Sequence, residues 1–235
     1  AAALDAVGVA DYLPVACDLG DLASVMAAVS AVAEPLDGII ANAGIMALPE
    51  VTRIQGIESQ FFVNHVGHFV LVNGLVGRLN FASRVVILSS AAHRMASRGL
   101  ELDNLDGGTD YEPWRLYGRS KLANIYFAQS LARRLRGGAS VNAVHPGVIE
   151  TNLGRHIPED NRVAMYERFR PILKTMGQGA ATQCLVAVRP EVEATTGAYF
   201  SDCVRTPTTP ADLPEAEGER LWALTEKIVG ELLGG

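Results

Sequence analysis

Apolar residues with two different spacings alternate along the whole chain. Short apolar runs bounded by turn residues predict strands at residues 12–17, 36–41, 84–88, 140–144 and 198–200. Apolar residues three and four apart predict helices at residues 23–33, 56–78, 114–136, 179–187 and 215–233. Because strands alternate with helices and no repeat or low-complexity linker divides the chain, we expect a single α/β domain over residues 1–235 with a mainly parallel sheet.

The first portion of a doubly wound, Rossmann-type sheet is missing from the sequence. Such a sheet begins with a strand, a glycine-rich turn and a helix whose N-terminus receives a pyrophosphate. The sequence contains neither G-x-x-x-G-x-G nor G-x-G-x-x-G. In the strand order 3-2-1-4-5-6, two strands would lie between those predicted at 12–17 and 36–41. We therefore expect roughly 40 to 50 residues upstream of Ala1, judged from the ~30-residue size of a βαβ unit.

Composition adds mainly exclusions. With 235 residues, of which 49% are hydrophobic and 20% charged, the chain has the make-up of a globular domain and not of a disordered or fibrous protein. The net charge of -6 and the scattered basic residues argue against a nucleic-acid partner. No apolar run reaches the ~18 to 20 residues of a membrane span, so we expect none in this chain.

The cysteines suggest a reducing compartment. Cys17, Cys184 and Cys203 show no C-x-x-C spacing and no paired histidine. We therefore expect neither a disulfide framework nor a metal site, and a cytoplasmic location.

Tyr117 and Lys121 are the first candidates for chemistry. They are four residues apart in the predicted helix 114–136, so both side chains lie on one face and reach a common ligand. The pKa of an ordinary phenol is ~10, and a neighbouring ammonium would lower it towards neutrality. Alone the pair is weak evidence, because the same spacing is common on unrelated helices.

Polar turns follow three of the predicted strands. They are Asn42-Ala43-Gly44, Ser89-Ser90, and Pro146-Gly147 with Thr151 shortly after it. Each is explained equally well as an ordinary turn. Open α/β sheets, however, bind ligands at the carboxyl ends of their strands, where all of these turns meet. A serine hydroxyl there can donate to a substrate oxygen as negative charge develops. Together with Tyr117, these turns predict a site at that edge.

The ordered set of motifs resembles the short-chain dehydrogenase/reductase superfamily over essentially the whole chain. The set comprises Asn42-Ala43-Gly44, Asn64, Ser90, Tyr117 with Lys121, and Pro146-Gly147. Four further features resemble the retinol dehydrogenase and WW-domain oxidoreductase branch. These are FVNHVGHF at residues 62–69, the 27-residue separation of Ser90 from Tyr117, SKLAN at 120–124 and GAYFSDC at 197–203.

The resemblance implies a role for each catalytic residue. Tyr117 would be the general acid for carbonyl reduction and the base for alcohol oxidation. Lys121 would hold the nicotinamide ribose hydroxyls and lower the pKa of Tyr117. Ser90 would orient and polarise the substrate oxygen, and Asn64 would anchor a water molecule that relays protons to Lys121. An asparagine that bonds its own backbone is the alternative for Asn64.

The resemblance also implies a cofactor site. Asp18 and Leu19 would face the adenine, Asn42, Ala43 and Gly44 the adenine ribose, and Pro146, Gly147, Val148 and Thr151 the nicotinamide with its carboxamide. The choice between NAD and NADP stays open, because a residue after the second strand decides it and that strand is absent. The missing glycine-rich turn, which cradles the pyrophosphate in this family, puts cofactor binding in question.

Two expectations concern surfaces. Residues 152–174 mix charged and apolar positions, which favours a mobile substrate lid, with an ordinary amphipathic surface helix as the alternative. Apolar residues on more than one face of helix 56–78 favour a homodimer or homotetramer through this helix and helix 114–136.

Two functions therefore remain open. The first is an NAD(P)-dependent oxidoreductase acting on a carbonyl or alcohol with an apolar body. The alternative is a non-catalytic dinucleotide-binding or scaffold protein of the same fold. The intact Ser90, Tyr117 and Lys121 favour the enzyme.

Overall fold

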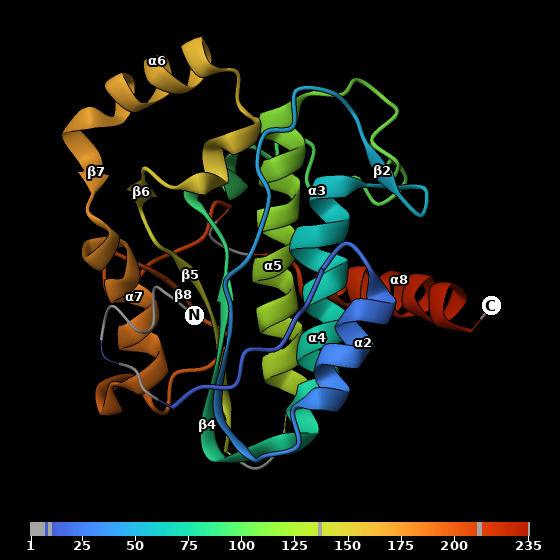
Figure 1. The fold of residues 1–235 in the computed structure, drawn as a ribbon, viewed down its shortest axis with the longest axis vertical. Coiled ribbons are helices and arrows are strands. Elements are labelled where there is room, and N and C mark those ends of the chain that lie inside the picture. The colour runs from blue at the N-terminus through green and yellow to red at the C-terminus, as the bar shows by residue number, and fades with distance from the viewer. Residues whose placement is uncertain (1–7, 9–10, 136–137, 211–212, 235) are drawn as a thin grey trace.

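A five-stranded sheet forms the centre of the molecule in the computed structural model, which describes residues 8, 11–135, 138–210 and 213–234. The strand order is β1-β4-β5-β8-β9 (Figure 1). The strands are β1 (Leu36–Ala41), β4 (Leu79–Leu88), β5 (Ser140–His145), β8 (Tyr199–Ser201) and β9 (Val204–Arg205). The first four run parallel and β9 is antiparallel to β8. The predicted α/β class with a mainly parallel sheet is confirmed.

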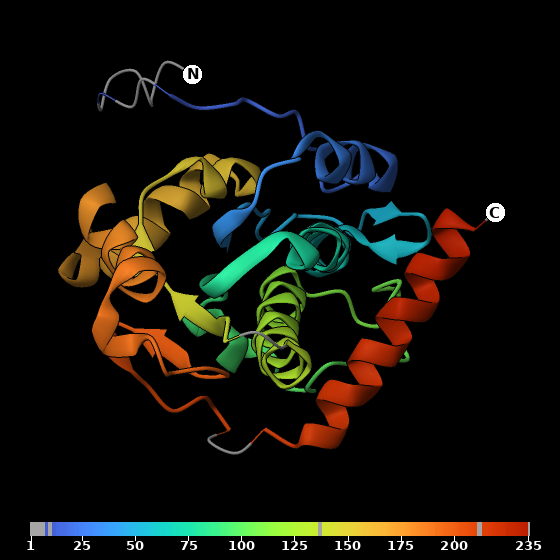
Figure 2. The same ribbon diagram turned by 90° about the horizontal axis from the view of Figure 1, so that it is seen from below.

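Helices cover both faces of this sheet. On one face α2 (Leu22–Ala31), α4 (Gly67–Leu75) and α5 (Pro113–Arg134) pack on alternate residues of β4, such as Val85 and Ile87. On the other face lies α7 (Met176–Val188) (Figure 2). Its Val186 side chain packs with Val86 and Leu88 of β4. Both faces of β4 are therefore apolar, as expected of a buried parallel strand.

Short elements complete the chain. They are the antiparallel hairpin of β2 (Arg53–Ile54) and β3 (Ile57–Glu58), the parallel pair of β6 (Val148–Ile149) and β7 (Leu173–Lys174), and the helices α3 (Ser59–Phe61), α6 (Glu159–Phe169) and α8 (Glu215–Leu233). A π-helical turn, η1 (Phe62–Val66), lies between α3 and α4. The 3₁₀ turns are η2 (Val76–Arg78), η3 (Ala91–Met95), η4 (Asn152–His156), η5 (Arg170–Ile172) and η6 (Pro190–Val192).

The predicted strand at 12–17 is wrong. Residues 11–18 form no strand, and they run outside the sheet towards α2 (Figure 2). A strand persists only where a neighbour pairs with it. Among the described residues β1 is the edge of the sheet, so no neighbour is available on that side. The helix end expected in residues 1–9 falls almost entirely outside the described residues, as do Arg136 and Gly137 at the end of the predicted helix 114–136.

The predicted helix 56–78 begins later and is not uniform. Gly56 lies in the turn of the β2–β3 hairpin with φ +81°, and the helical segment starts only at Ser59. Its start is capped by Glu58, whose carboxylate accepts from the Gln60 and Phe61 backbone N–H groups. The sequence spacing of apolar residues did not reveal the hairpin.

The second apolar face of this segment packs against α8 of the same chain. Phe69 and Phe127 contact the ring of Trp222 with centroid distances of 4.8 and 5.8 Å. The Arg134 guanidinium lies 4.0 Å from the centroid of the same ring and pairs with Glu219. The apolar pattern is thus explained within one chain, and self-association remains a prediction. No helix in the described part of the chain is both long and apolar enough to cross a membrane.

Candidate active site

The carboxyl ends of β1, β4 and β5 meet at one edge of the sheet. Ala41 pairs with Ile87 and Leu88 pairs with Val144, so the turns that follow these strands begin side by side. The Ser89 N–H donates to Val144 O at 2.8 Å and continues the ladder one residue further. The predicted gathering of residues 42–44, 89–90 and 146–147 at one edge is what the structure has.

Helix α5 carries Tyr117 and Lys121 to this edge. Its N-terminus is capped by Glu112, whose carboxylate accepts from the Trp114 and Arg115 N–H groups. Tyr117 and Lys121 are both only 4% exposed, and the Lys121 Nζ atom lies 5.7 Å from the centroid of the Tyr117 ring. The Ser89 hydroxyl donates to Lys121 O at 2.7 Å, which fastens α5 to the end of β4.

Burial sets the pKa of both groups. Desolvation raises the pKa of the Tyr117 phenol to about 12, although a hydrogen bond with the Ser90 side chain opposes this rise. The lowering of the Tyr117 pKa expected from Lys121 is therefore not found in the protein alone. Burial disfavours the phenolate more than the nearby ammonium favours it. Burial also lowers the pKa of Lys121 to about 8. Its Nζ donates to Leu88 O at 3.2 Å.

Replacing Lys121 with methionine is expected to remove activity and yet favour folding near neutral pH. The difference between a pKa of 10.5 for an ordinary lysine and about 8 in the fold disfavours folding by about 3 kcal/mol at low pH. Lys121→Met also loses the hydrogen bond to Leu88 O, and this loss offsets about 1 kcal/mol of the gain in stability. The cost of the ammonium is fully present below pH 8 and disappears as the pH rises through 10.5, where both states bind no proton.

Unfolding free energies between pH 7 and 10.5 check this expectation. Wild type should gain stability relative to Lys121→Met across this interval. Lys227→Met, at an exposed position of α8, is the matched control and should leave the free energy of unfolding unchanged. A constant difference between wild type and Lys121→Met over the whole interval would contradict the prediction.

Asn64 lies in the π-helical turn and fastens the loop after β1. Its Oδ1 accepts from the Ile45 N–H and its Nδ2 donates to Ile45 O, both at 2.9 Å. Nδ2 also lies 3.0 Å from the Ser120 hydroxyl, and the residue is fully buried. Its side chain thus bonds a distant backbone segment and not its own. π-helical turns often occur at functional sites, where the inserted residue redirects a side chain.

Gly44 leaves space between Asn64 and Lys121. A Cβ atom at this position would lie 2.9 Å from Asn64 Oδ1 and 3.6 Å from Lys121 Nζ. The glycine thus leaves a cradle over the buried Lys121 ammonium, which donates to Leu88 O. An ammonium has three donors, so Lys121 can still donate to ligand hydroxyls there.

Ser90 is the N-cap of the 3₁₀ turn η3 and stands two residues after the end of β4 at Leu88. Its Oγ accepts from the Ala92 N–H at 3.1 Å, which caps the turn. The turn packs closely on α5 at Gly118, where a Cβ atom would collide with Ala92 O and lie 3.0 Å from Ala96 N. Gly118 thus allows η3 to lie close to α5, and the sequence analysis did not single it out. A glycine inside a helix was the available signal.

Gly118→Ala is expected to destabilise the protein by about 1 to 3 kcal/mol and to lower kcat. The new methyl group meets backbone atoms of η3, which cannot turn aside as a side chain can. Pushing η3 away from α5 separates Ser90 from Tyr117. Gly177→Ala is the control, because its Cβ would meet nothing within 4 Å in helix α7. That variant should gain up to about 1 kcal/mol. Thermal unfolding and turnover of both variants test this, and equal stability of the two would refute it.

The remaining predicted cofactor residues differ in how far they are exposed. Pro146, Gly147 and Val148 lie half-buried after β5, Gly147 has φ +98°, and Thr151 is exposed and caps η4. Lys174, which the sequence analysis missed, contacts Pro146 O and pairs with Asp202 beside this turn. Asp18 is exposed, but the Leu19 side chain packs with the core residues of α4. The Leu19 carbonyl also lies against Gly67 of α4, where a Cβ atom would collide with it.

An apolar wall surrounds Tyr117. Met46, Ala47 and Ile157 form a buried cluster with the Tyr117 ring, and Leu153, Trp114 and Met165 pack against it. Met165 belongs to α6, which lies beyond the carboxyl ends of the strands (Figure 1). The predicted lid segment 152–174 therefore contacts the site through its apolar positions. Among the described residues, no group of three or more His, Cys, Asp or Glu side chains could hold a metal ion.

Comparison with known proteins agrees with this geometry. Residues 1–201 match the family described as Enoyl-(Acyl carrier protein) reductase. Retinol dehydrogenase 14 of Homo sapiens is 40% identical over 238 residues, covering 96% of this chain and 69% of the relative. The chain belongs to the short-chain dehydrogenase/reductase family. A WW domain-containing oxidoreductase of Homo sapiens is 38% identical, with 85% of this chain and 50% of the relative covered. The predicted retinol dehydrogenase-like branch is confirmed.

Solved structures with a similar fold include one of a short-chain dehydrogenase. An uncharacterised protein of Mycobacterium paratuberculosis superimposes with a TM-score of 0.68 and 31% identity, covering 90% of this chain and 73% of that one. A short-chain dehydrogenase of Burkholderia cenocepacia in complex with NADP has a TM-score of 0.59 and 28% identity, with 79% and 72% covered. The chain spans between half and about two thirds of the length of the curated relatives it matches.

Proposed function

We propose that this protein catalyses hydride transfer between a nicotinamide dinucleotide and a carbonyl or alcohol whose body is apolar. The observation that carries the proposal is the meeting of the Tyr117 phenol, the Ser90 side chain and the Lys121 ammonium at the carboxyl edge of the sheet. A family relative that binds NADP, with 28% identity, supports the choice of cofactor class.

The residues present fit the nicotinamide half of such a cofactor. Gly44 leaves a cradle above Lys121, and Lys121 has donors to spare for ribose hydroxyls. Residues 146–148 and Thr151 lie at the end of β5, where a nicotinamide and its carboxamide would be held. The bound cofactor would supply the hydride. No glycine-rich turn occurs in the sequence, so we assign no residue to the pyrophosphate.

The protein's own groups then handle the oxygen and its proton. In carbonyl reduction Tyr117 donates its phenolic proton to the oxygen as negative charge develops there, and Ser90 donates a hydrogen bond to the same oxygen. Because burial raises the pKa of Tyr117 to about 12, the phenol is fully protonated at neutral pH and ready to act as the acid. Lys121 places the ribose and thereby the reacting carbon.

Turnover measured with NADH and with NADPH tests the proposal. Purified protein is mixed with each dinucleotide and an apolar aldehyde such as decanal, and loss of the reduced nicotinamide is followed. Dinucleotide binding by calorimetry is measured in parallel. Binding without turnover, together with identical binding by Tyr117→Phe, would favour the non-catalytic alternative.

Met165→Ala is expected to change substrate preference without changing the chemistry. The side chain packs on the cluster around Tyr117, so its loss should reduce kcat/KM for decanal relative to propanal by about 1 to 3 kcal/mol. Val163→Ala, at an exposed position of the same helix, should change neither value. An equal loss for both aldehydes would argue that α6 does not contact the substrate, and that the segment is an ordinary surface helix.

A further inference from the structure

His93 lies in η3 and is bonded on both of its ring nitrogens. Its Nδ1 lies 2.7 Å from Ser90 O, and its Nε2 accepts from the Thr209 N–H at 3.1 Å. The residue is 1% exposed. The sequence analysis gave His93 no role in the site.

The partners of His93 fix its tautomer. A backbone N–H can only donate, so Nε2 must be the unprotonated nitrogen. A backbone carbonyl can only accept, so Nδ1 must carry the proton that bonds to Ser90 O. Both bonds therefore require the neutral Nδ1–H form. A protonated imidazole would place an Nε2–H against the N–H of Thr209.

We propose that His93 is a positioning residue that orients Ser90 towards the substrate oxygen. The segment 206–210 holds the His93 ring in place for this role. The Ser90 carbonyl accepts two hydrogen bonds from one residue, from the His93 backbone N–H at 3.1 Å and from its ring. Two bonds to one carbonyl fix the peptide plane that follows Ser90, and with it the direction of the Ser90 side chain.

The imidazole itself is held from a third side. The Tyr199 ring of β8 packs on it nearly edge-on, with centroids 5.2 Å apart and an interplanar angle of 73°. His93 therefore joins three separate parts of the chain, namely η3, β8 and the residues that follow β9. A shift in the 206–210 segment would be transmitted to Ser90 through one rigid ring. This inference rests on the proposed function, in which Ser90 contacts the substrate.

Two substitutions separate the two bonds of the ring. His93→Phe keeps the ring bulk and removes both bonds. His93→Asn places an amide N–H where Nδ1–H stood, so the bond to Ser90 O can persist, whereas the bond to Thr209 cannot. We expect His93→Phe to lower kcat on the order of 10- to 100-fold, with little change in the KM for the dinucleotide. His93→Asn should recover most of that loss.

A double-mutant cycle with Ser90→Ala distinguishes positioning from a general structural role. If His93 acts through the Ser90 hydroxyl, His93→Phe should lower kcat less than twofold in the Ser90→Ala background. The same fold-loss in both backgrounds, or a His93→Asn variant no better than His93→Phe, would overturn the proposal. Melting temperatures of all variants are measured alongside.

An independent readout does not depend on turnover. Nitrogen-15 shifts of the imidazole in the wild-type protein should show the Nδ1–H tautomer, and the Thr209 and Ala92 amides should lose exchange protection in His93→Phe. An Nε2–H tautomer, or unchanged protection at Ala92, would refute the role of His93. If the wild type binds no dinucleotide and turns over no carbonyl, the proposed function fails, and these spectra still decide whether His93 fixes Ser90.

Discussion

Tyr117→Phe is expected to lower kcat for carbonyl reduction by about 10²- to 10⁴-fold while the fold stays intact. The substitution removes the one hydroxyl that can donate a proton to the substrate oxygen in the proposed reaction. It leaves the ring in place, and the ring packs with Met46, Ala47 and Ile157. Because the buried phenol has a pKa of about 12, removing it also removes a group that is uncharged near neutral pH, so folding changes little.

Tyr126→Phe is the matched control for this experiment. Tyr126 is 5% exposed in the same helix but packs with the core residues of α4 and α8, away from Ser90. Its variant should retain activity within about twofold. Steady-state kinetics and thermal unfolding of both variants are needed. Activity of Tyr117→Phe within threefold of wild type would remove Tyr117 from the proposed chemistry.

The raised pKa of Tyr117 also predicts how each direction depends on pH. Reduction uses the phenol, which is present throughout the neutral range, so its rate should not rise with pH. Oxidation of an alcohol uses the phenolate, whose fraction increases as the pH approaches 12 from below. The oxidation rate should therefore increase with pH. Rate profiles in both directions with the same substrate pair check this.

The arrangement of the candidate site could be predicted from sequence because it depends on local spacing and strand direction. Tyr117 and Lys121 share a face of α5 simply because they are four residues apart. The turns at 42–44, 89–90 and 146–147 meet simply because parallel strands end at one edge. Neither inference requires knowledge of distant contacts, and the structure has both.

Other parts of the structure depend on distant partners, which a local sequence pattern does not indicate. The residues at 12–17 have the composition of a strand but find no neighbouring strand. The second apolar face of the segment 59–75 is covered by Trp222 of α8, which lies more than 140 residues away in sequence, so this face alone does not indicate another subunit, and self-association stays a prediction. Likewise, the tautomer of His93 follows from the distant Thr209, which no spacing near His93 indicates.

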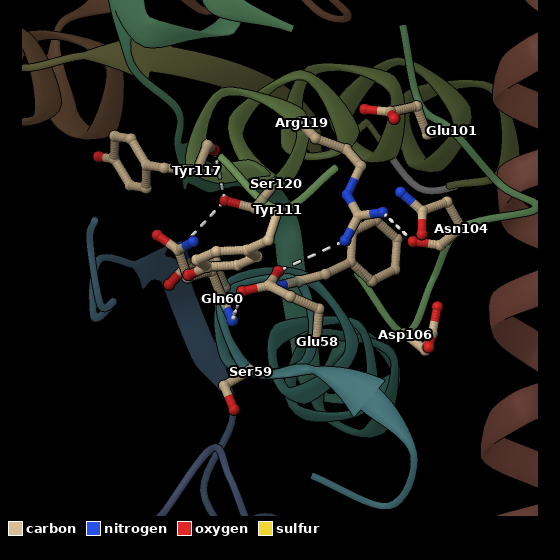
Figure 3. A network of polar contacts seen from close by, with 12 residues as sticks. Glu58, Ser59, Gln60, Glu101, Asn104, Asp106, Tyr111, Tyr117, Arg119 and Ser120 are labelled. Atoms are coloured by element: carbon tan, nitrogen blue, oxygen red, sulfur yellow. Dashed lines mark hydrogen bonds and ion pairs between the residues drawn. The ribbon is translucent and has the colours of Figure 1, made fainter. Parts of the chain in front are cut away.

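A buried ion pair on the opposite side of α5 also joins residues that are distant in sequence. Arg119 lies between Tyr117 and Lys121 in sequence but points away from Tyr117 (Figure 3). Its Nη2 lies 3.4 Å from Glu58 Oε2, and both side chains are fully buried. Its Nη1 donates to Asn104 O at 2.6 Å, and its guanidinium lies 5.1 Å from the centroid of the Phe61 ring. One arginine thus joins α5 to the α3 start and to the loop 96–112.

Breaking this pair is expected to have the largest effect on stability. Arg119→Met leaves the Glu58 carboxylate buried without a cation, and Glu58→Gln leaves the guanidinium buried without an anion. Each change should lower the free energy of unfolding by about 3 to 5 kcal/mol. The double variant should lose much less than the sum, because removing both charges leaves neither uncompensated.

The exposed pair Arg53–Asp106 provides the contrast for this experiment. Its atoms lie 3.2 Å apart, closer than those of the buried pair, but its side chains are 40% and 54% exposed. Arg53→Met should therefore cost only about 0 to 1 kcal/mol, since water screens the charges and solvates whichever partner remains. Denaturant unfolding of the four variants decides the matter. Additive losses in the double variant, or equal losses for Arg53→Met and Arg119→Met, would show that burial does not set the strength of the Glu58–Arg119 coupling.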